Sequence, residues 1–324
     1  MTMECKSYQF ENEICQEISS LSKLDNWHCF LALLEDYVII FLMAATCSVS
    51  WYLYPVAVLI IGSRQRALAT LLHEASHKTL AKNKFFNFAI GTFFSGYFVL
   101  QTMGSYRESH VRFHHGHFGD IELDPDYKFA IEAGWYARPQ SVEKFTLHNI
   151  VLPFLLAKVP SYLCSLIQHR LLDKRNRQET IVMIVYLGVI ASVFIGFGLG
   201  KYILLFWIVP YLTTFQIIGW FIEMSEHYPL MNNSINLYNT RNRHSHWLEK
   251  FLTGMHNESY HLVHHLNPAI PFWNVPKAHQ IYLQDKNYAQ FDRQSGGIFI
   301  SAKNTPTLIQ SAIATLRSPS QTDL

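Results

Sequence analysis

Apolar residues run almost without interruption through four stretches of this chain, and polar segments separate the stretches. The first covers residues 30–62 and exceeds the roughly 20 residues with which one helix crosses a bilayer. A break near residues 48–54 would divide it into two helical arms, the second of which continues to His77. The other stretches cover residues 85–104, 180–200 and 202–221. This pattern predicts an all-α protein with helices long enough to span a membrane.

The connections between these stretches predict two helical hairpins. Gly200 and Lys201 leave room only for a tight turn between the last two stretches, so we expect these to be antiparallel. Basic residues are rare at both hairpin tips, where Lys201 is the exception. They gather instead in residues 64–84, 107–144, 170–177 and 241–250. Because Lys and Arg favour the cytosolic side, we expect an integral, multi-pass membrane protein. Its four transmembrane helices would have both tips outside, with a helical cap and both termini in the cytosol.

Two apolar segments do not fit a simple span. Residues 85–104 are long enough to cross, but crossing would place the histidines before and after them on opposite sides of the membrane. We therefore expect a re-entrant or interfacial segment. Pro153, Lys158 and Pro160 interrupt residues 148–168, which predicts an amphipathic helix in the membrane interface. The predicted division is a cytosolic N-terminal segment, a membrane domain and a polar tail, at residues 1–29, 30–295 and 296–324.

The composition agrees with a membrane domain joined to a polar cap. Charged residues make up 15% of the 324 residues, against roughly 25% in an ordinary soluble domain, yet the mean hydropathy is only +0.07. A net charge of +2 gives no broad basic face for nucleic acid. The five cysteines form no CxxC pair, which excludes a disulfide framework and a thiolate metal site. The first 25 residues are polar and lack the pattern of a cleaved signal peptide.

Nine of the 17 histidines fall into four spaced groups. His73 and His77 are four positions apart, which places both imidazoles on one helix face. A lone buried histidine is usually a hydrogen-bonded core residue. Nine in four groups point instead to metal binding, because neutral imidazole is the commonest protein metal ligand. The candidate ligands are His73, His77, His110, His114, His115, His227, His261, His264 and His265.

The ligand type narrows the choice of metal. Nitrogen-rich sites without sulfur suit iron, zinc, copper or nickel, and a structural zinc site needs only four ligands. Nine imidazoles exceed the needs of one ion and are sufficient for two, with positions left open for oxygen. We therefore favour a dinuclear iron centre at the cytosolic side of the membrane.

Two other classes of protein fit part of the pattern. His73, Glu74 and His77 match HExxH, in which zinc proteases use the glutamate as general base. A protease would leave the other histidine groups unexplained, and beside iron Glu74 would instead orient an imidazole. A metal transporter would place histidines or acidic residues inside its spans, but residues 180–200 and 202–220 contain none. Both classes are therefore disfavoured.

The last histidine group and its surroundings resemble the membrane fatty acid desaturase family. The family's YHxxHH pattern and the LPxxH after it are similar to HNESYHLVHHLNPAIP at residues 256–271 and VPKAH at residues 275–279. Family segments also resemble TRN at residues 240–242 and the acidic residues 119–126. The resemblance extends over residues 71–281, which is most of the chain.

This resemblance implies four transmembrane helices beneath a cytosolic cap, with two iron ions bound by the nine histidines. It also implies that O2 and two external electrons oxidise an unactivated C–H bond, by desaturation or by hydroxylation as in a monooxygenase. The iron ions would cycle between Fe2+ and Fe3+. The chain has no cysteine cluster, HPGG segment or GxGxxG motif for an internal electron carrier. A separate donor is therefore implied, either ferredoxin or cytochrome b5 with its reductase.

One position departs from part of the family. Acyl-CoA members carry asparagine four residues before the lone histidine, where this chain has Glu223. Glu223 would bind iron directly, bind it through water, contact a polar substrate, or remain in interfacial water. A lipid acyl chain is the favoured substrate because it fits the membrane location. The alternative is a small, polar, amino-acid-like substrate, whose positive charge Glu223, Glu226 and residues 120–126 would attract.

Overall fold

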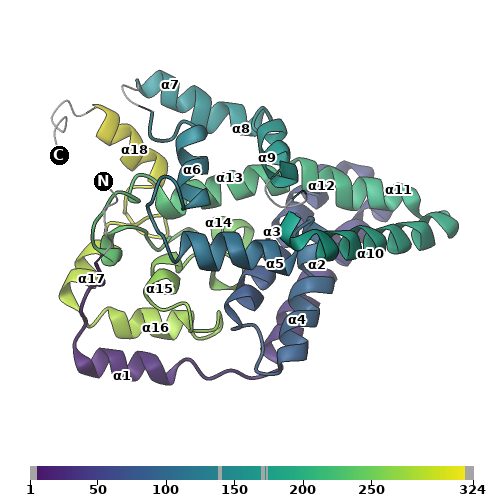
Figure 1. Ribbon diagram of the computed structural model, residues 1–324. Coiled ribbons are helices and arrows are strands. Elements are labelled where there is room, and N and C mark those ends of the chain that lie inside the picture. Colours follow the sequence, from purple (N-terminus) through teal and green to yellow (C-terminus); the bar gives the residue numbers. More distant parts are fainter. Residues whose placement is uncertain (1–5, 138–140, 169–171, 173, 318–324) are drawn as a thin grey trace. The chain divides into compact units, whose positions relative to one another are not determined.

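The computed structural model describes residues 6–137, 141–168, 172 and 174–317 (Figure 1). Helices form all the regular secondary structure of these residues, apart from isolated β-bridges. The predicted all-α class is therefore confirmed. The chain divides into two compact units. Unit 1 contains Met1–Lys23, Arg112–Leu155 and Trp220–Leu324, and unit 2 contains Leu24–Val111 and Leu156–Gly219.

Four helical segments in the described residues are long and apolar enough to cross a membrane, in agreement with the predicted number. Many of their apolar side chains are exposed, and Phe41 is 72% exposed. An apolar surface of this extent is suited to lipid rather than water. The segments are α2 (His28–Val49), η1 (Trp51–Leu53) with α3 (Tyr54–His77), α10 (Arg177–Gly196), and a run formed by α11 (Gly200–Ile203), η7 (Leu204–Ile208), α12 (Val209–Leu212) and α13 (Thr214–His227).

The break predicted near residues 48–54 lies between α2 and α3. Ser50 is extended, with φ of −156° and ψ of 123°, and the turn η1 follows it. Pro55 then occupies the first turn of α3, where its missing N–H leaves no hydrogen bond unmade. α2 packs along α3, and Ile40 and Ile61 share one apolar cluster. The hairpin arrangement and its orientation in the membrane stay predictions.

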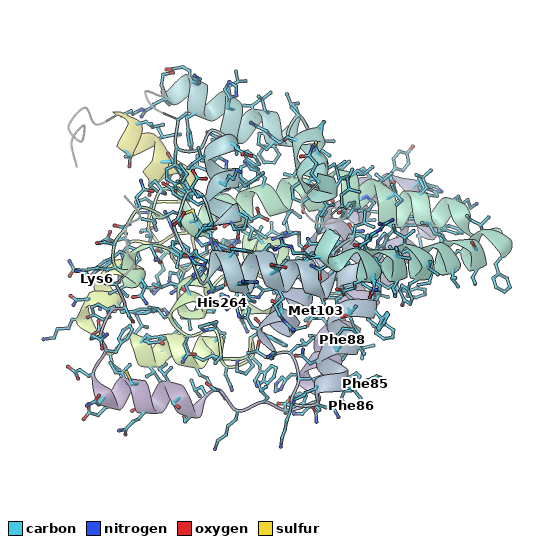
Figure 2. The ribbon with its side chains drawn as sticks, viewed as in Figure 1. Lys6, Phe85, Phe86, Phe88, Met103 and His264 are labelled. Atoms are coloured by element: carbon cyan, nitrogen blue, oxygen red, sulfur yellow. The ribbon has the colours of Figure 1, made fainter. Side chains whose placement is uncertain are left out.

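Residues 85–104 form short helical segments that are too short to cross. A Cβ on Gly96 would lie 2.8 Å from the carbonyl oxygen of Gln101, so a bend here requires glycine. Phe85 and Phe88 on the first helix are exposed (Figure 2). The re-entrant or interfacial placement of this stretch stays a prediction. The segments are α4 (Lys84–Phe93), η2 (Gly96–Val99) and α5 (Met103–Tyr106), and unit 2 also contains η6 (Lys174–Asn176).

The single amphipathic helix predicted for residues 148–168 is wrong. The helices of this stretch are interrupted at residues 155–158, where Leu156 has a φ of 61°. A leucine rarely adopts this left-handed conformation, so Leu156 itself gives no sign of the break; the local signal is Pro160, at the start of the helix that follows. Pro153 and Pro160 each lie in the first turn of a helix, where proline is favoured. The segments are α7 (Val142–Thr146), η4 (Leu147–Val151), α8 (Leu152–Phe154) and α9 (Val159–Leu166).

Unit 1 is built from short helices around an apolar core that includes Ile18, Leu262 and Tyr282. The stretch predicted to be a polar tail contributes to this unit, because Glu249 accepts a 2.6 Å hydrogen bond from the N–H of Ile298. The three-part division of the chain stays a prediction. Besides α7, η4 and α8, the helices of this unit include α1 (Asn12–Ser20), α6 (Pro125–Glu132), η8 (Asn236–Tyr238), α14 (Trp247–Thr253), η9 (Met255–Asn257), α15 (His261–Leu266), α16 (Val275–Tyr282), α17 (Lys286–Asp292) and α18 (Leu308–Arg317).

Candidate metal centre

Unit 2 brings three of the predicted ligands together. His73 and His77 lie one turn apart at the end of α3, and His110 lies on the π-helix η3 (Arg107–His114). Ring centroids are 4.9 Å apart for His73 and His77, and 4.6 Å apart for His73 and His110. The ligand nitrogens of these histidines lie within 4.8 Å of one another. The i, i+4 pair therefore lies on one helix face, as predicted, beside a third imidazole.

Main-chain features fix this group. α3 ends at His77, and Lys78 after it adopts a left-handed conformation with φ of 67°. The Nε of Arg107 donates a 3.0 Å hydrogen bond to the carbonyl oxygen of Ser76, which ties η3 to the end of α3. π-helices are rare and occur frequently at functional sites. The wide turn of η3 thus supplies His110 where α3 presents its histidine pair.

Glu74 lies where an orienting carboxylate is expected. Its Oε1 is 3.4 Å from the Nδ1 of His73, and its Oε2 accepts a 3.0 Å hydrogen bond from the Oγ1 of Thr79. A carboxylate beside Nδ1 favours a proton there and leaves Nε2 as the metal donor. Glu74 is buried and its contacts suit an orienting role, which stays a prediction.

Unit 1 brings the other six predicted ligands together (His264 is labelled in Figure 2). The Nε2 atoms of His261 and His227 are 3.0 Å apart, as are those of His265 and His261. The Nε2 atoms of His264 and His115 are also 3.0 Å apart. The six come from the end of η3, the residue after it, the end of α13 and the short helix α15: His114, His115, His227, His261, His264 and His265.

This convergence fits a metal ion better than a network of hydrogen bonds. A neutral imidazole has one N–H and one lone pair, and the Nδ1 of His261 faces Glu226 at 3.6 Å, which favours its N–H. The lone pair on Nε2 of His261 can then accept only one hydrogen bond, although His227 and His265 both present Nε2 at 3.0 Å. A cation would accept lone pairs from all three. The residues therefore fit a nitrogen-bound metal such as iron.

Burial and neighbouring charges set the protonation of two of these histidines. Burial lowers the pKa of His265 well below 6.5, and the charges of His115 and other nearby histidines lower it further. His265 is therefore neutral, which is the form that binds metal. Burial also lowers the pKa of His114, but the charges of Asp124 and Asp126 and the hydrogen bond that His114 donates to Asp124 more than offset this and raise the pKa to about 9.

Asp124 has a role that the sequence analysis missed. The Nδ1 of His114 lies 2.9 Å from Oδ1 of Asp124, and the N–H of Gly119 donates to Oδ2 at 2.9 Å. Asp124 is fully buried and also caps α6. The acidic stretch was predicted to attract a cationic substrate, whereas this carboxylate orients an imidazole. Asp124 and Pro125 form a helix-start pattern shortly after the histidine group. This pattern is the sequence signal that could have located Asp124.

The two glutamates near His227 differ in their contacts. Glu226, predicted to attract substrate, is buried; its Oε1 accepts a 3.1 Å hydrogen bond from Nη2 of Arg243, and its Oε2 faces His261. Glu223 lies one turn before His227 on α13, which continues to His227, so the two share a face as predicted. In the part of the chain that the structure describes, the groups with ligand atoms within 4.8 Å include Glu226 and omit Glu223. The role of Glu223 stays a prediction.

Comparison with known proteins agrees with this arrangement. The family model described as fatty acid desaturase matches residues 49–294. The chain is also similar to a curated protein, dihydrorhizobitoxine desaturase of Bradyrhizobium elkanii. The two are 38% identical over 316 residues, which cover 94% of this chain and 89% of that protein. The matched range includes every predicted metal ligand. The chain is therefore a member of the fatty acid desaturase family.

Proposed function

We propose that this protein is a membrane-bound, O2-dependent diiron desaturase that acts on a small amino-acid-like substrate. The observation that carries the proposal is the convergence of imidazole nitrogens, three in unit 2 and six in unit 1. We assign these nine histidines as ligands of two iron ions. When bound, the irons would supply the oxidising power to remove hydrogen from an unactivated C–H bond, with O2 as oxidant.

Three carboxylates lie beside the histidines, where they can hold the imidazoles in the orientation that metal binding needs. Glu74 faces Nδ1 of His73, Asp124 faces Nδ1 of His114, and Glu226 faces Nδ1 of His261. Each pairing keeps one ring nitrogen protonated and the other available to metal. Such contacts hold the imidazoles in place before substrate arrives, so that less reorganisation is needed during the reaction.

The substrate class rests on the similarity to dihydrorhizobitoxine desaturase, whose substrate is small and amino-acid-like. The similarity extends over 94% of this chain and 89% of that protein, so it is not confined to the segments that carry the histidines. Glu223 supports the same choice, because a carboxylate on α13 one turn from His227 suits a substrate with a positive charge better than an acyl chain.

A lipid acyl chain is the second candidate. It is supported by the family match and by the four apolar segments, which would place the enzyme among its substrates. With either substrate, the protein lies in the lipid bilayer with its histidines on the cytosolic side. It takes electrons from ferredoxin or from cytochrome b5 with its reductase, and hydroxylation would be the outcome if oxygen were transferred instead of a second hydrogen removed.

The test is product analysis after expression with a ferredoxin and its reductase. Both the soluble amino-acid pool and the membrane lipids are compared with cells that carry His264→Ala. We expect a new unsaturated amino-acid-like product that is absent with the variant, and about two irons per purified chain. A new double bond found only in lipid acyl chains would refute the substrate class, and one zinc without iron would refute the diiron centre.

His148 offers a matched control. It is an exposed histidine of unit 1 outside the nine, so His148→Ala changes the same kind of side chain without removing a proposed ligand. This variant should keep its iron and its product.

A further inference from the structure

A second polar cluster lies in unit 1, outside the nine histidines. His244, His279 and Asp292 present ligand atoms within 4.8 Å of one another, and Asn242 and Tyr288 contact the same group. All except His244 are buried. Buried polar groups at this density are costly unless each is hydrogen-bonded, so their contacts decide what the cluster does.

The contacts form one continuous hydrogen-bond network. The Nε2 of His244 lies 2.9 Å from Oδ2 of Asp292, and Nδ2 of Asn242 donates to Oδ1 of Asp292 at 2.7 Å. The second N–H of that amide donates to the hydroxyl of Tyr288 at 2.8 Å, and this hydroxyl lies 2.8 Å from Nδ1 of His279. Both donors of Asn242 are therefore engaged with fixed partners. The hydrogen bond between Nε2 of His244 and Oδ2 of Asp292 uses the two atoms that would have to bind a metal ion in this cluster.

The remaining atom of Asn242 reaches the helix that carries three proposed ligands. Its Oδ1 accepts hydrogen bonds from the N–H groups of Leu262 at 3.1 Å and Val263 at 3.4 Å. These groups lie in the first turn of α15, where helix N–H groups have no partner within the helix. The residue before α15, Tyr260, provides no side-chain cap. The cap thus comes from a residue 20 positions away in the sequence.

We propose that Asn242 and Asp292 are positioning residues that fix the orientation of α15 for metal binding. Asp292 and Tyr288 hold the donors of the Asn242 amide, so its oxygen must face α15. α15 contains six residues and is too short to be stable alone, so its orientation depends on this cap. Small rotations of α15 would move the Nε2 atoms of His261, His264 and His265 together. This inference rests on the proposed diiron function.

The variants Asn242→Asp and Asp292→Asn test the proposal, since both preserve side-chain shape. Asn242→Asp keeps the oxygen that faces α15, loses the donors to Asp292 and Tyr288, and puts two carboxylates side by side. Asn236→Ala is the control: Oδ1 of Asn236 accepts a 2.7 Å hydrogen bond from the N–H of Tyr8 in the same unit, so the change removes a bond to the N-terminal segment and not the cap of α15.

The measurement is titration of the metal-free, detergent-purified protein with Co2+, followed by its absorption spectrum, together with thermal unfolding. We expect both test variants to fold and to bind Co2+ roughly 10- to 100-fold more weakly than the original protein, with an altered spectrum. Asn236→Ala should lower only the melting temperature. Unchanged Co2+ affinity and an unchanged spectrum in both folded variants would overturn the proposal. A third variant, His244→Ala, would overturn it by losing one whole metal equivalent, because the cluster of His244 and Asp292 would then itself bind metal. If the original protein itself binds neither Co2+ nor iron, that result refutes the proposed diiron function, and with it the positioning role that depends on it.

Discussion

The two units hold their histidines by different means. In unit 2, His73 and His77 belong to α3, a helix of 24 residues, and the pair needs only the regular spacing of that helix. In unit 1, three ligands belong to α15, a helix of six residues that depends on the distant Asn242 for its cap. Local helix geometry therefore fixes the positions of His73 and His77, whereas long-range hydrogen bonds fix the positions of the three ligands on α15.

The two histidine groups are also supported by different kinds of contact, close helix packing in unit 2 and buried polar contacts in unit 1. α4 packs tightly on α3 in unit 2, where Nδ2 of Asn87 donates a 2.9 Å hydrogen bond to the carbonyl oxygen of Ala75. In unit 1, buried charged and polar groups such as Glu226 and Arg243 carry the support. We expect packing changes to affect the first group and isosteric polar changes to affect the second.

Removal of a ligand should give the largest effect and the same effect in both units. His77→Ala in unit 2 and His264→Ala in unit 1 should each abolish turnover and lower the iron content, because each ion loses a nitrogen donor. Product formation with the redox partner and iron per chain are the measurements. Full activity in either variant would contradict the assignment of that histidine as an essential ligand.

Asp124→Asn should give the next largest effect. The variant keeps the shape of Asp124 but removes the charge that faces Nδ1 of His114. Metal affinity should fall roughly 10- to 100-fold, as is typical when an orienting partner is lost. Titration of metal-free protein with Fe2+ measures this. Asp120→Asn is the control, since Asp120 lies in the same acidic stretch and accepts only local main-chain hydrogen bonds; an equal loss in both would contradict a specific role for Asp124.

Gly91→Ala should affect unit 2 through packing alone. A Cβ on Gly91 would lie 2.2 Å from the Cβ of Ala75, so α4 must move away from α3. We expect a loss of about 1–3 kcal/mol in the free energy of unfolding, measured in detergent. Gly188→Ala on α10 is the matched control, because its Cβ would meet nothing within 4 Å. It should be neutral or slightly stabilising, and equal losses in the two variants would argue against close packing at Gly91.

The pH dependence of the metal-free protein should give the smallest effect, confined to unit 1. The pKa of His114 is raised from 6.5 to about 9, so its contribution to stability is complete below pH 6.5 and is lost as the pH rises through 9. The pKa of His265 is lowered from 6.5, so stability also falls as the pH drops below that value. The melting temperature should therefore be highest near pH 6.5, where both contributions are present, and should fall on either side. Asp124→Asn should flatten the alkaline side only; an unchanged alkaline side would contradict the pairing of His114 with Asp124.

The sequence predicts well the features that depend on neighbouring residues. The break at Ser50 follows from an apolar run too long for one helix, and the facing pair His73 and His77 follows from helix periodicity. The sequence does not reveal features that depend on distant contacts or rare backbone conformations. The bend at Leu156 requires a left-handed leucine, and the role of Asn242 depends on partners at Tyr288 and Asp292.

The cap formed by Asn242 has a consequence for how this chain can vary. Its amide uses two donors and one acceptor at once, on a stem of one carbon. Among the standard side chains asparagine alone offers this combination, since aspartate lacks the donors and glutamine is longer. In a library of all replacements, position 242 should thus tolerate almost none, although it is not one of the nine proposed ligands. Exposed positions of α10, such as Val185, should accept most apolar residues.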